Sequence, residues 1–277
     1  RDPPAPERRD RLMPLVATGT EPVLEVAART DPGLKRAVNE DAVLAADPCF
    51  LVADGMGGHE AGDRASRAAI AVFGEAFTRP GPATLAEIDG ALEAARAAVQ
   101  EISSGTRRGA GCTLTGLIRT VHEGEPYWYV LNVGDSRVYL HRGSGLVQLT
   151  QDHSLREELR GSDEAAAAPR NVITRALGSD DDRHDAWLLP LERGSRLLVC
   201  SDGLTTEVED DELRAVLTMA GRPVEAAEEL LRRAHAGGGR DNITIVVLDV
   251  VSGGAEPPAA DEQDDEDTIE QTRPGRR

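Results

Sequence analysis

Between residues 112 and 149, strand-like segments follow one another with only short turns between them. CTLTGLI (112–118), YWYVLNV (127–133) and RVYLHR (137–142) are short runs of apolar or β-branched residues, the composition typical of strands. Parallel neighbours need a long crossover, usually a helix, whereas antiparallel neighbours can be joined by a tight turn. This order favours an antiparallel component and disfavours a simple alternation of strands and helices.

Five further apolar runs extend this pattern along the chain. They are LEVAART (24–30), AVLAA (42–46), FLVAD (50–54), RLLVCSD (196–202) and NITIVVLDVV (242–251). Several are apolar throughout, which predicts strands that are covered on both faces.

Helical periodicity supplies the covering layers. One apolar stripe typical of core packing runs along each of four segments: 62–77, 85–102, 210–220 and 223–236. A chain of 277 residues can bury a substantial core, and no interior stretch has the composition of a linker. We therefore expect one α+β domain over residues 22–251, a disordered arm at 1–21 and a disordered acidic tail at 252–277.

Charge and cysteine content limit the classes of function. The net charge of -18 argues against nucleic-acid binding, which needs clustered basic residues. The sequence contains no run of about 18 apolar residues, the length needed to span a membrane. The first residues also lack the apolar stretch of a signal peptide. Cys49, Cys112 and Cys200 are far apart in apolar surroundings, which predicts reduced thiols and a cytoplasmic protein.

Acidic residues stand at the ends of several predicted strands. Asp54, Asp135 and Asp202 follow apolar runs, Asp241 precedes the last strand, and the pair Glu40 and Asp41 precedes another. A single Asp-Gly after an apolar run is usually a turn, but so many acids at strand ends predict a shared site. Carboxylates brought together would repel one another unless a cation were bound.

The residue types favour a particular kind of cation. Hard oxygen donors without neighbouring histidine or thiolate suit Mg²⁺ or Mn²⁺ and disfavour zinc. Two such ions about 3.5–4 Å apart can share and activate a water for attack on phosphorus. Gly55 has no side chain, so its carbonyl could approach a metal. Two other phosphate-binding motifs are excluded, because Asp63 replaces the lysine of a P-loop and Glu60 breaks a GxGxxG pattern.

An ordered set of motifs then suggests a family. The set is RAVNED (36–41), DGMGGHEAGDRAS (54–66), GCT (111–113), NVGDSR (132–137), TQDHS (150–154), VITRALG (172–178), CSDGLT (200–205) and GGRDNITIVV (238–247). Over about residues 22–251 the chain resembles the metal-dependent protein phosphatases of type 2C in their bacterial serine/threonine form. The resemblance implies a four-layer αββα sandwich, in which two antiparallel sheets are flanked by helix pairs.

The resemblance also implies roles for individual residues. Asp54, Asp202 and Asp241 match the direct ligands of two Mn²⁺ or Mg²⁺ ions, with Asp54 bridging both and the Gly55 carbonyl on the second. Glu40 and Asp41 match acids that hold metal-bound waters, Asp135 matches a ligand of a third, weaker metal shared with Asp202, and Arg36 matches the phosphate-binding arginine. Asn242 is expected to support the ligand loop by hydrogen bonding.

Two departures from the family pattern stand near this site. Met56 replaces a histidine that has been proposed as the leaving-group acid of eukaryotic relatives, and His59 need not take over that role. The flap expected at about 153–171 is short and carries an alanine run, and the alternative interpretation is a surface helix and loop.

The implied activity is hydrolysis of phosphoserine or phosphothreonine by a metal-bridging hydroxide, without a phosphoenzyme, opposing a bacterial Ser/Thr kinase. The partners would be that kinase and its phosphorylated substrates. One alternative is a catalytically inactive regulator that binds phosphoproteins; it predicts that at least one metal-ligand residue is missing, and none is missing here. The other alternative is a hydrolase of small phosphate esters. Thr268 and Thr272 follow an acidic run in the tail and are candidate phosphorylation sites that a phosphothreonine-binding module could recognise.

Overall fold

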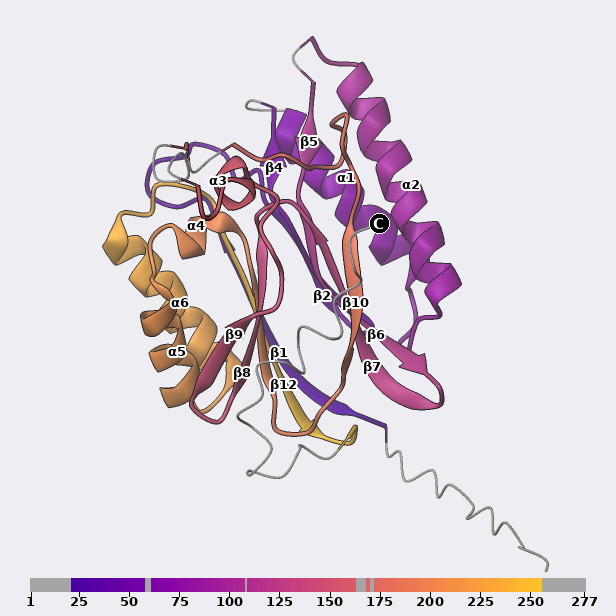
Figure 1. Cartoon of the computed structure of the whole chain (residues 1–277), viewed down its shortest axis with the longest axis vertical. Helices are drawn as coiled ribbons and strands as arrows, with labels where there is room; N and C mark the ends of the chain where they lie inside the picture. Colours follow the sequence, from indigo (N-terminus) through magenta and orange to yellow (C-terminus); the bar gives the residue numbers. More distant parts are fainter. Residues whose placement is uncertain (1–20, 58–60, 108, 163–167, 170–171, 256–277) are drawn as a thin grey trace, which may run out of the picture.

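The computed structural model describes residues 21–57, 61–107, 109–162, 168–169 and 172–255. Two five-stranded antiparallel sheets face each other, each with a pair of helices on its outer face (Figure 1). The predicted four-layer αββα sandwich is therefore confirmed. The predicted arm and tail lie almost entirely outside the described residues, and the boundaries of the three segments stay predictions.

The strands of each sheet come from distant parts of the chain. The first sheet contains, in spatial order, β1 (Val23–Asp31), β12 (Ile243–Ser252), β11 (Arg196–Cys200), β8 (Arg137–Arg142) and β9 (Gly145–Gln148). The second contains β10 (Asp185–Pro190), β7 (Glu125–Val133), β6 (Leu114–His122), β3 (Cys49–Ala53) and β2 (Ala42–Ala46). A short third ladder pairs β4 (Gly55–Met56) with β5 (Gly111–Cys112).

The outer layers are the four predicted helices, with ends within two residues of expectation. They are α1 (Ala61–Ala76), α2 (Leu85–Ser104), α5 (Asp210–Met219) and α6 (Pro223–Gly237). Two short helices, α3 (Leu155–Glu158) and α4 (Asp202–Thr205), complete the described elements. Local sequence sets the helix starts: Thr84 and Glu87 form a reciprocal capping box before α2, and Pro223 occupies the first turn of α6.

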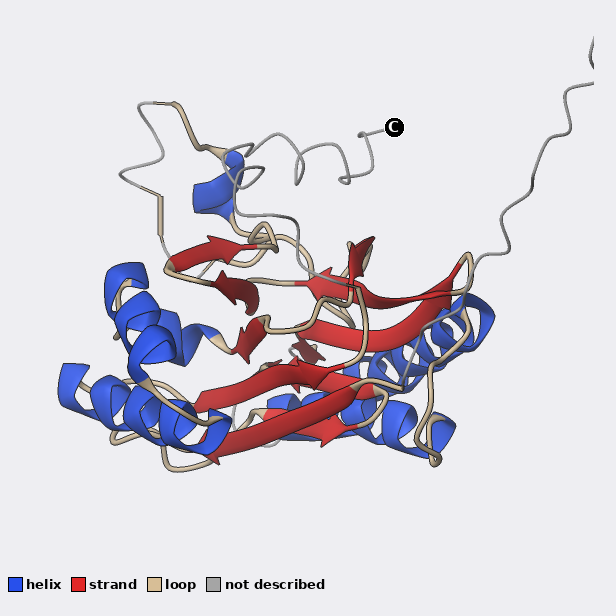
Figure 2. Ribbon diagram, turned by 90° about the horizontal axis from the view of Figure 1, so that it is seen from below, coloured by secondary structure: helices blue, strands red, loops and turns tan. Residues whose placement is uncertain are grey.

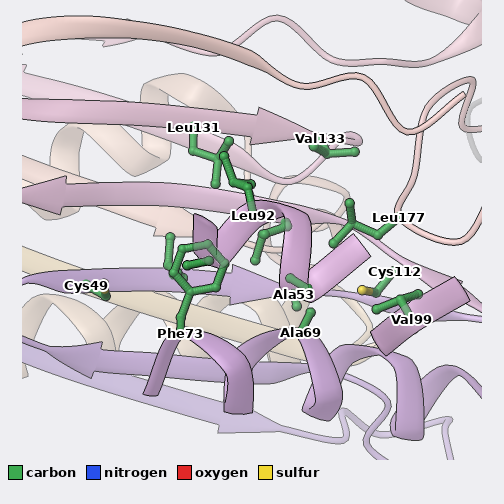
Figure 3. Packing of buried hydrophobic residues seen from close by; sticks show 14 of the residues in the cluster. Cys49, Ala53, Ala69, Phe73, Leu92, Val99, Cys112, Leu131, Val133 and Leu177 are labelled. Carbon is green, nitrogen blue, oxygen red and sulfur yellow. The ribbon is translucent and has the colours of Figure 1, made fainter. Parts of the chain in front are cut away.

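Three apolar layers hold the sandwich together. One lies between α1, α2 and the second sheet, where Phe73 and Leu92 meet Leu131 (Figure 3). Another lies beneath α5 and α6, and the third fills the space between the sheets, where the rings of Phe50 and Trp128 meet edge to face with centroids 5.9 Å apart. Figure 2 shows the sheets stacked between the helix layers. β3 and β11 are buried along their whole length because both faces of these strands are covered.

The loops that carry the predicted site residues gather at one end of this sandwich. β4, β5, α3 and α4 lie at the upper end in Figure 1. The described part of the predicted flap includes α3, and Ser154 bridges to Ile173. No described helix has the length and apolar character needed to cross a lipid bilayer.

Candidate active site

A pocket of about 340 Å³ opens at the end of the sandwich where the predicted acids meet. Its lining includes seven of the predicted site residues: Arg36, Glu40, Asp54, Gly55, Asp135, Asp202 and Asp241. The fold thus brings together side chains up to 205 positions apart in the chain. Asp41 is not among the lining residues, and it lies 6% exposed beside them.

Each carboxylate is held by the end of a regular element. Asp54 directly follows β3, and its backbone exchanges two hydrogen bonds with Thr113: Asp54 N–H donates to Thr113 Oγ1 at 2.9 Å, and Thr113 N–H donates to Asp54 O at 2.9 Å. Asp202 begins α4 and is separated from the end of β11 by Ser201 alone, and Asp241 stands two residues before β12. Since strand ends are fixed by their ladders, the positions of these acids follow from the sheets.

Buried hydroxyl groups connect the acidic loops to one another. Thr113 Oγ1 lies 2.9 Å from Ser136 Oγ, next to Asp135, and both side chains are fully buried. Ser201 Oγ donates to Asp41 Oδ2 at 2.8 Å. The sequence predicts no role for Thr113, Ser136 or Ser201, although each stands inside one of the motifs quoted above.

Asn242 ties the loop that carries Arg36 and Glu40 to the start of β12. Its amide donates to the carbonyls of Pro32 and Val38 at 3.1 and 2.9 Å, and its Oδ1 accepts the N–H of Glu40 at 2.8 Å. The predicted hydrogen-bonding support by Asn242 is confirmed, and it acts on residues 32–40.

Gly55 is required for close packing. A Cβ at this position would lie 2.3 Å from the carbonyl oxygen of Gly62 and 2.5 Å from that of Glu40. The start of α1 therefore approaches the loop after β3 as closely as the backbone allows. The role of the Gly55 carbonyl as a metal ligand stays a prediction.

Burial, together with repulsion between neighbouring carboxylates, disfavours the charged forms of the acids in the site. Burial raises the pKa of Asp135 to about 8, and repulsion from Asp202 adds to the effect. Burial likewise raises the pKa of Asp41 to about 7 and that of Asp202 to about 6. Burial, reinforced by repulsion from four neighbouring aspartates, raises the pKa of Asp54 well above its usual range. Such a cluster becomes stable in its ionised form when a multivalent cation neutralises it.

The donor set fits a hard divalent cation. All of the donors are carboxylate or carbonyl oxygens, and among the described residues Asp135 Oδ1 is buried without a hydrogen-bond partner. No group of three or more His, Cys, Asp or Glu side chains in the described ranges forms a ready-made metal cage. Mg²⁺ needs no such cage, because it keeps several waters and binds through only one or two carboxylates.

Arg36 is the cation of the pocket lining. Its Nη2 donates to Asp241 Oδ2 at 2.7 Å, and this hydrogen bond raises the pKa of the guanidinium. The two side chains are 50% and 36% exposed, so the guanidinium remains accessible to an anion. Its planar fork can bind two oxygens of one phosphate.

Met56 and His59 are the residues concerned in the first departure from the family pattern. Met56 lines the pocket, whereas His59 lies outside the described residues. Cys49, Cys112 and Cys200 are free and buried, which confirms that they are packed in the core. Burial raises the pKa of Cys49 and Cys200 to about 12 and that of Cys112 further, so none is suited to act as a thiolate nucleophile.

A sandwich of two antiparallel sheets with an acid-lined pocket at one end defines the class of metal-dependent phosphatases, and the comparisons with known proteins agree. Residues 35–235 match the family model described as protein phosphatase 2C. The chain belongs to this family, as the sequence motifs predicted.

The relatives and solved structures to which the chain is similar include bacterial members of this family. The chain is 36% identical over 232 residues to the serine/threonine protein phosphatase PstP of Mycobacterium tuberculosis, a match that covers 80% of this chain and 44% of PstP. It is 36% identical over 239 residues to the serine/threonine phosphatase Stp of Listeria monocytogenes, covering 78% of this chain and 92% of Stp. The crystal structure of the PstP catalytic domain with two manganese ions superposes with a TM-score of 0.74 at 36% identity, covering 84% of this chain and all of that domain.

Proposed function

We infer that this chain is a serine/threonine protein phosphatase that requires two divalent ions, Mn²⁺ or Mg²⁺. The observation that carries this inference is the convergence of Asp54, Asp135, Asp202 and Asp241 on one pocket that also contains Arg36. The names of the bacterial relatives and the two manganese ions of the PstP catalytic domain support it.

The residues of the pocket divide into metal holders and a phosphate holder. Asp54 would contact both ions, Asp202 and Asp241 would complete the two sites, and the Gly55 carbonyl would add a donor to the second. Glu40 and Asp41 would accept hydrogen bonds from waters, and Asp135 with Asp202 would hold a third, weaker ion. When bound, the ions lower the pKa of a water and polarise phosphate oxygens.

Arg36 orients the substrate. Its guanidinium, half exposed at the mouth of the pocket, donates two N–H groups to oxygens of the phosphoryl group, which fixes the ester bond relative to the carboxylates. For this contact the fork must turn from Asp241 toward the phosphate. Because the cysteines are buried thiols, the chain offers them no part in the reaction.

The test is release of phosphate from a phosphothreonine peptide with Mn²⁺, with Mg²⁺ and with EDTA. We expect activity that depends on the metal and that falls at least about 100-fold in Asp202→Asn, in line with the loss of a major electrostatic contributor. Asp211→Asn, a change on a side chain that is 91% exposed on α5, is the matched control and should keep full activity. A fall below about threefold in Asp202→Asn would contradict the assignment.

Two further arms separate the alternatives. A higher rate on a small phosphate ester than on the phosphopeptide would favour the metabolite hydrolase. No activity under any condition, in folded protein, would favour the phosphoprotein-binding regulator.

We further propose that the partners are phosphorylated proteins, a cognate Ser/Thr kinase among them, in the reducing cytoplasm. The three free thiols support this compartment. Thr268 and Thr272 lie outside the described residues, and their phosphorylation followed by recognition through a phosphothreonine-binding module is a separate proposal. Mass spectrometry of the tail after incubation with the kinase tests it, and an unmodified tail would contradict it.

A further inference from the structure

Three consecutive glycines, 237–239, lead from the last residue of α6 into the loop before β12, where Arg240 and Asp241 follow. Gly238 and Gly239 have φ values of 143° and 52°, a region that favours glycine. A glycine segment loses more conformational freedom on folding than any other. The backbone conformation of this loop therefore depends on contacts from outside it.

Glu207 supplies one set of these contacts. Its side chain is only 1% exposed, and its Oε1 accepts the backbone N–H of Arg240 at 3.0 Å. The Arg240 guanidinium donates to the same carboxylate twice, from Nε to Oε1 at 2.9 Å and from Nη2 to Oε2 at 2.8 Å. The hydrogen bond from Arg240 also keeps the pKa of Glu207 below its usual range.

The glycines allow this approach. A Cβ at Gly237 would lie 2.8 Å from the carbonyl oxygen of Glu207, and one at Gly238 would lie 3.4 Å from both of its carboxylate oxygens. On its other side the loop meets the turn before Arg36, where Leu34 N–H donates to Gly239 O at 2.7 Å. The loop is therefore fixed between Glu207 and the segment that carries the phosphate-binding arginine.

The backbone of Glu207 also contacts the short helix α4, which begins with Asp202. Its N–H donates to the carbonyl of Leu204 at 3.1 Å, within the turn that Asp202 begins. Glu207 thus connects the helix of Asp202, through its backbone, to the loop of Asp241, through its buried side chain.

We propose that Glu207 is a positioning residue of the metal site, which fixes the backbone at Arg240 and so sets the separation of the Asp202 and Asp241 carboxylates. The inference rests on the proposed function, in which these two aspartates hold the metal ions. Residues that orient metal ligands from behind typically change metal affinity about 10–100-fold when they are replaced.

The experiment measures Mn²⁺ binding to the full chain from the electron paramagnetic resonance signal of free Mn²⁺. In Glu207→Gln an amide nitrogen faces the Arg240 guanidinium, so at least one hydrogen bond and the ion pair are lost, and we expect the dissociation constant to rise about tenfold. The matched control is Asp249→Asn. It breaks another largely buried carboxylate–arginine pair, with Arg196 Nε at 2.6 Å from Asp249 Oδ1, toward the opposite end of β12, and should leave Mn²⁺ affinity within twofold.

A second variant provides a test if Glu207→Gln fails to fold. Arg240→Ala removes an exposed guanidinium and two of the three hydrogen bonds, and it should weaken Mn²⁺ binding severalfold. Parent-like affinity in both Glu207→Gln and Arg240→Ala, or an equal loss in Asp249→Asn, would overturn the inference. Asp241→Asn separates the two levels: parent-like affinity there would overturn the metal assignment itself, whereas a loss there with no loss in the Glu207 and Arg240 variants would overturn only the role of Glu207.

Discussion

Replacing Asp135 by asparagine should stabilise the metal-free chain, and the gain should grow with pH. Asp135 is 6% exposed, and its pKa is raised to about 8 by burial and by repulsion from Asp202. In an unfolded chain an aspartate has a pKa of about 3.9. Because the folded value is the higher one, the stability contributed by this group is fully present below pH 3.9 and is lost as the pH rises toward 8.

The difference of about four pKa units sets the magnitude. At about 1.4 kcal/mol per unit, the aspartate costs the folded chain about 5 kcal/mol near pH 8 and only about 1–2 kcal/mol at pH 5. Asparagine removes this cost, but it keeps a buried polar group that lacks a full set of partners, which costs about 1–3 kcal/mol. We therefore expect a net gain of about 2–4 kcal/mol at pH 8 and close to none at pH 5.

The assay is thermal unfolding in EDTA at the two pH values. For a chain of this size a gain of 1 kcal/mol raises Tm by about 2–4 °C, so Asp135→Asn should melt about 4–16 °C above the parent at pH 8. The exposed variant Asp211→Asn should melt with the parent at both values. An unchanged or lower Tm at pH 8, or a gain of equal size at pH 5, would refute the electrostatic account of the pocket.

Three further predictions concern packing and reactivity. Gly55→Ala should lower the free energy of unfolding by about 1–3 kcal/mol through overpacking, whereas Gly74→Ala in α1, where a Cβ meets nothing within 4 Å, should raise it by about 0.5–1 kcal/mol; denaturant unfolding compares them, and similar effects would contradict the packing argument. Thr113→Val should cost about 1–3 kcal/mol because it leaves the Asp54 N–H without its acceptor, and Thr113→Ser should restore most of the loss in the same assay. Iodoacetamide should leave the native protein active in phosphate release, because Cys49, Cys112 and Cys200 are buried with raised pKa values. Rapid inactivation would contradict the proposal that no cysteine takes part in the reaction.

The apolar pattern of the chain predicts most of the fold because the core strands are covered on both faces. No predicted strand segment covers β9 or β10. β10 begins at Asp185, ends at Pro190 and is only partly buried along its length. It is an edge strand of the second sheet, where proline is tolerated and burial is incomplete. A strand of this kind carries too weak a pattern to be recognised from sequence.

The acids of the pocket could be named from the sequence because each stands at the end of an apolar run. Their convergence required the sheets, and the ion pair of Arg36 with Asp241 required side-chain geometry. Glu207 lies in a turn without periodic pattern, 33 positions before its partner. Nothing local marks such a residue, because its contact depends on how two distant loops fold together.

The pairing of β1 with β12 has a consequence for synthesis of the protein. β12 lies between β1 and β11 in the first sheet, and Val23 is registered with Ser252. A ribosome delivers β1 early, but that strand must wait for more than 200 residues before its hydrogen-bonding partner emerges. Asp241 arrives just before the same late strand, so a nascent chain that lacks β12 holds neither a complete first sheet nor a complete pocket. The proposed metal site can therefore become complete only after translation has passed Asp241 and β12.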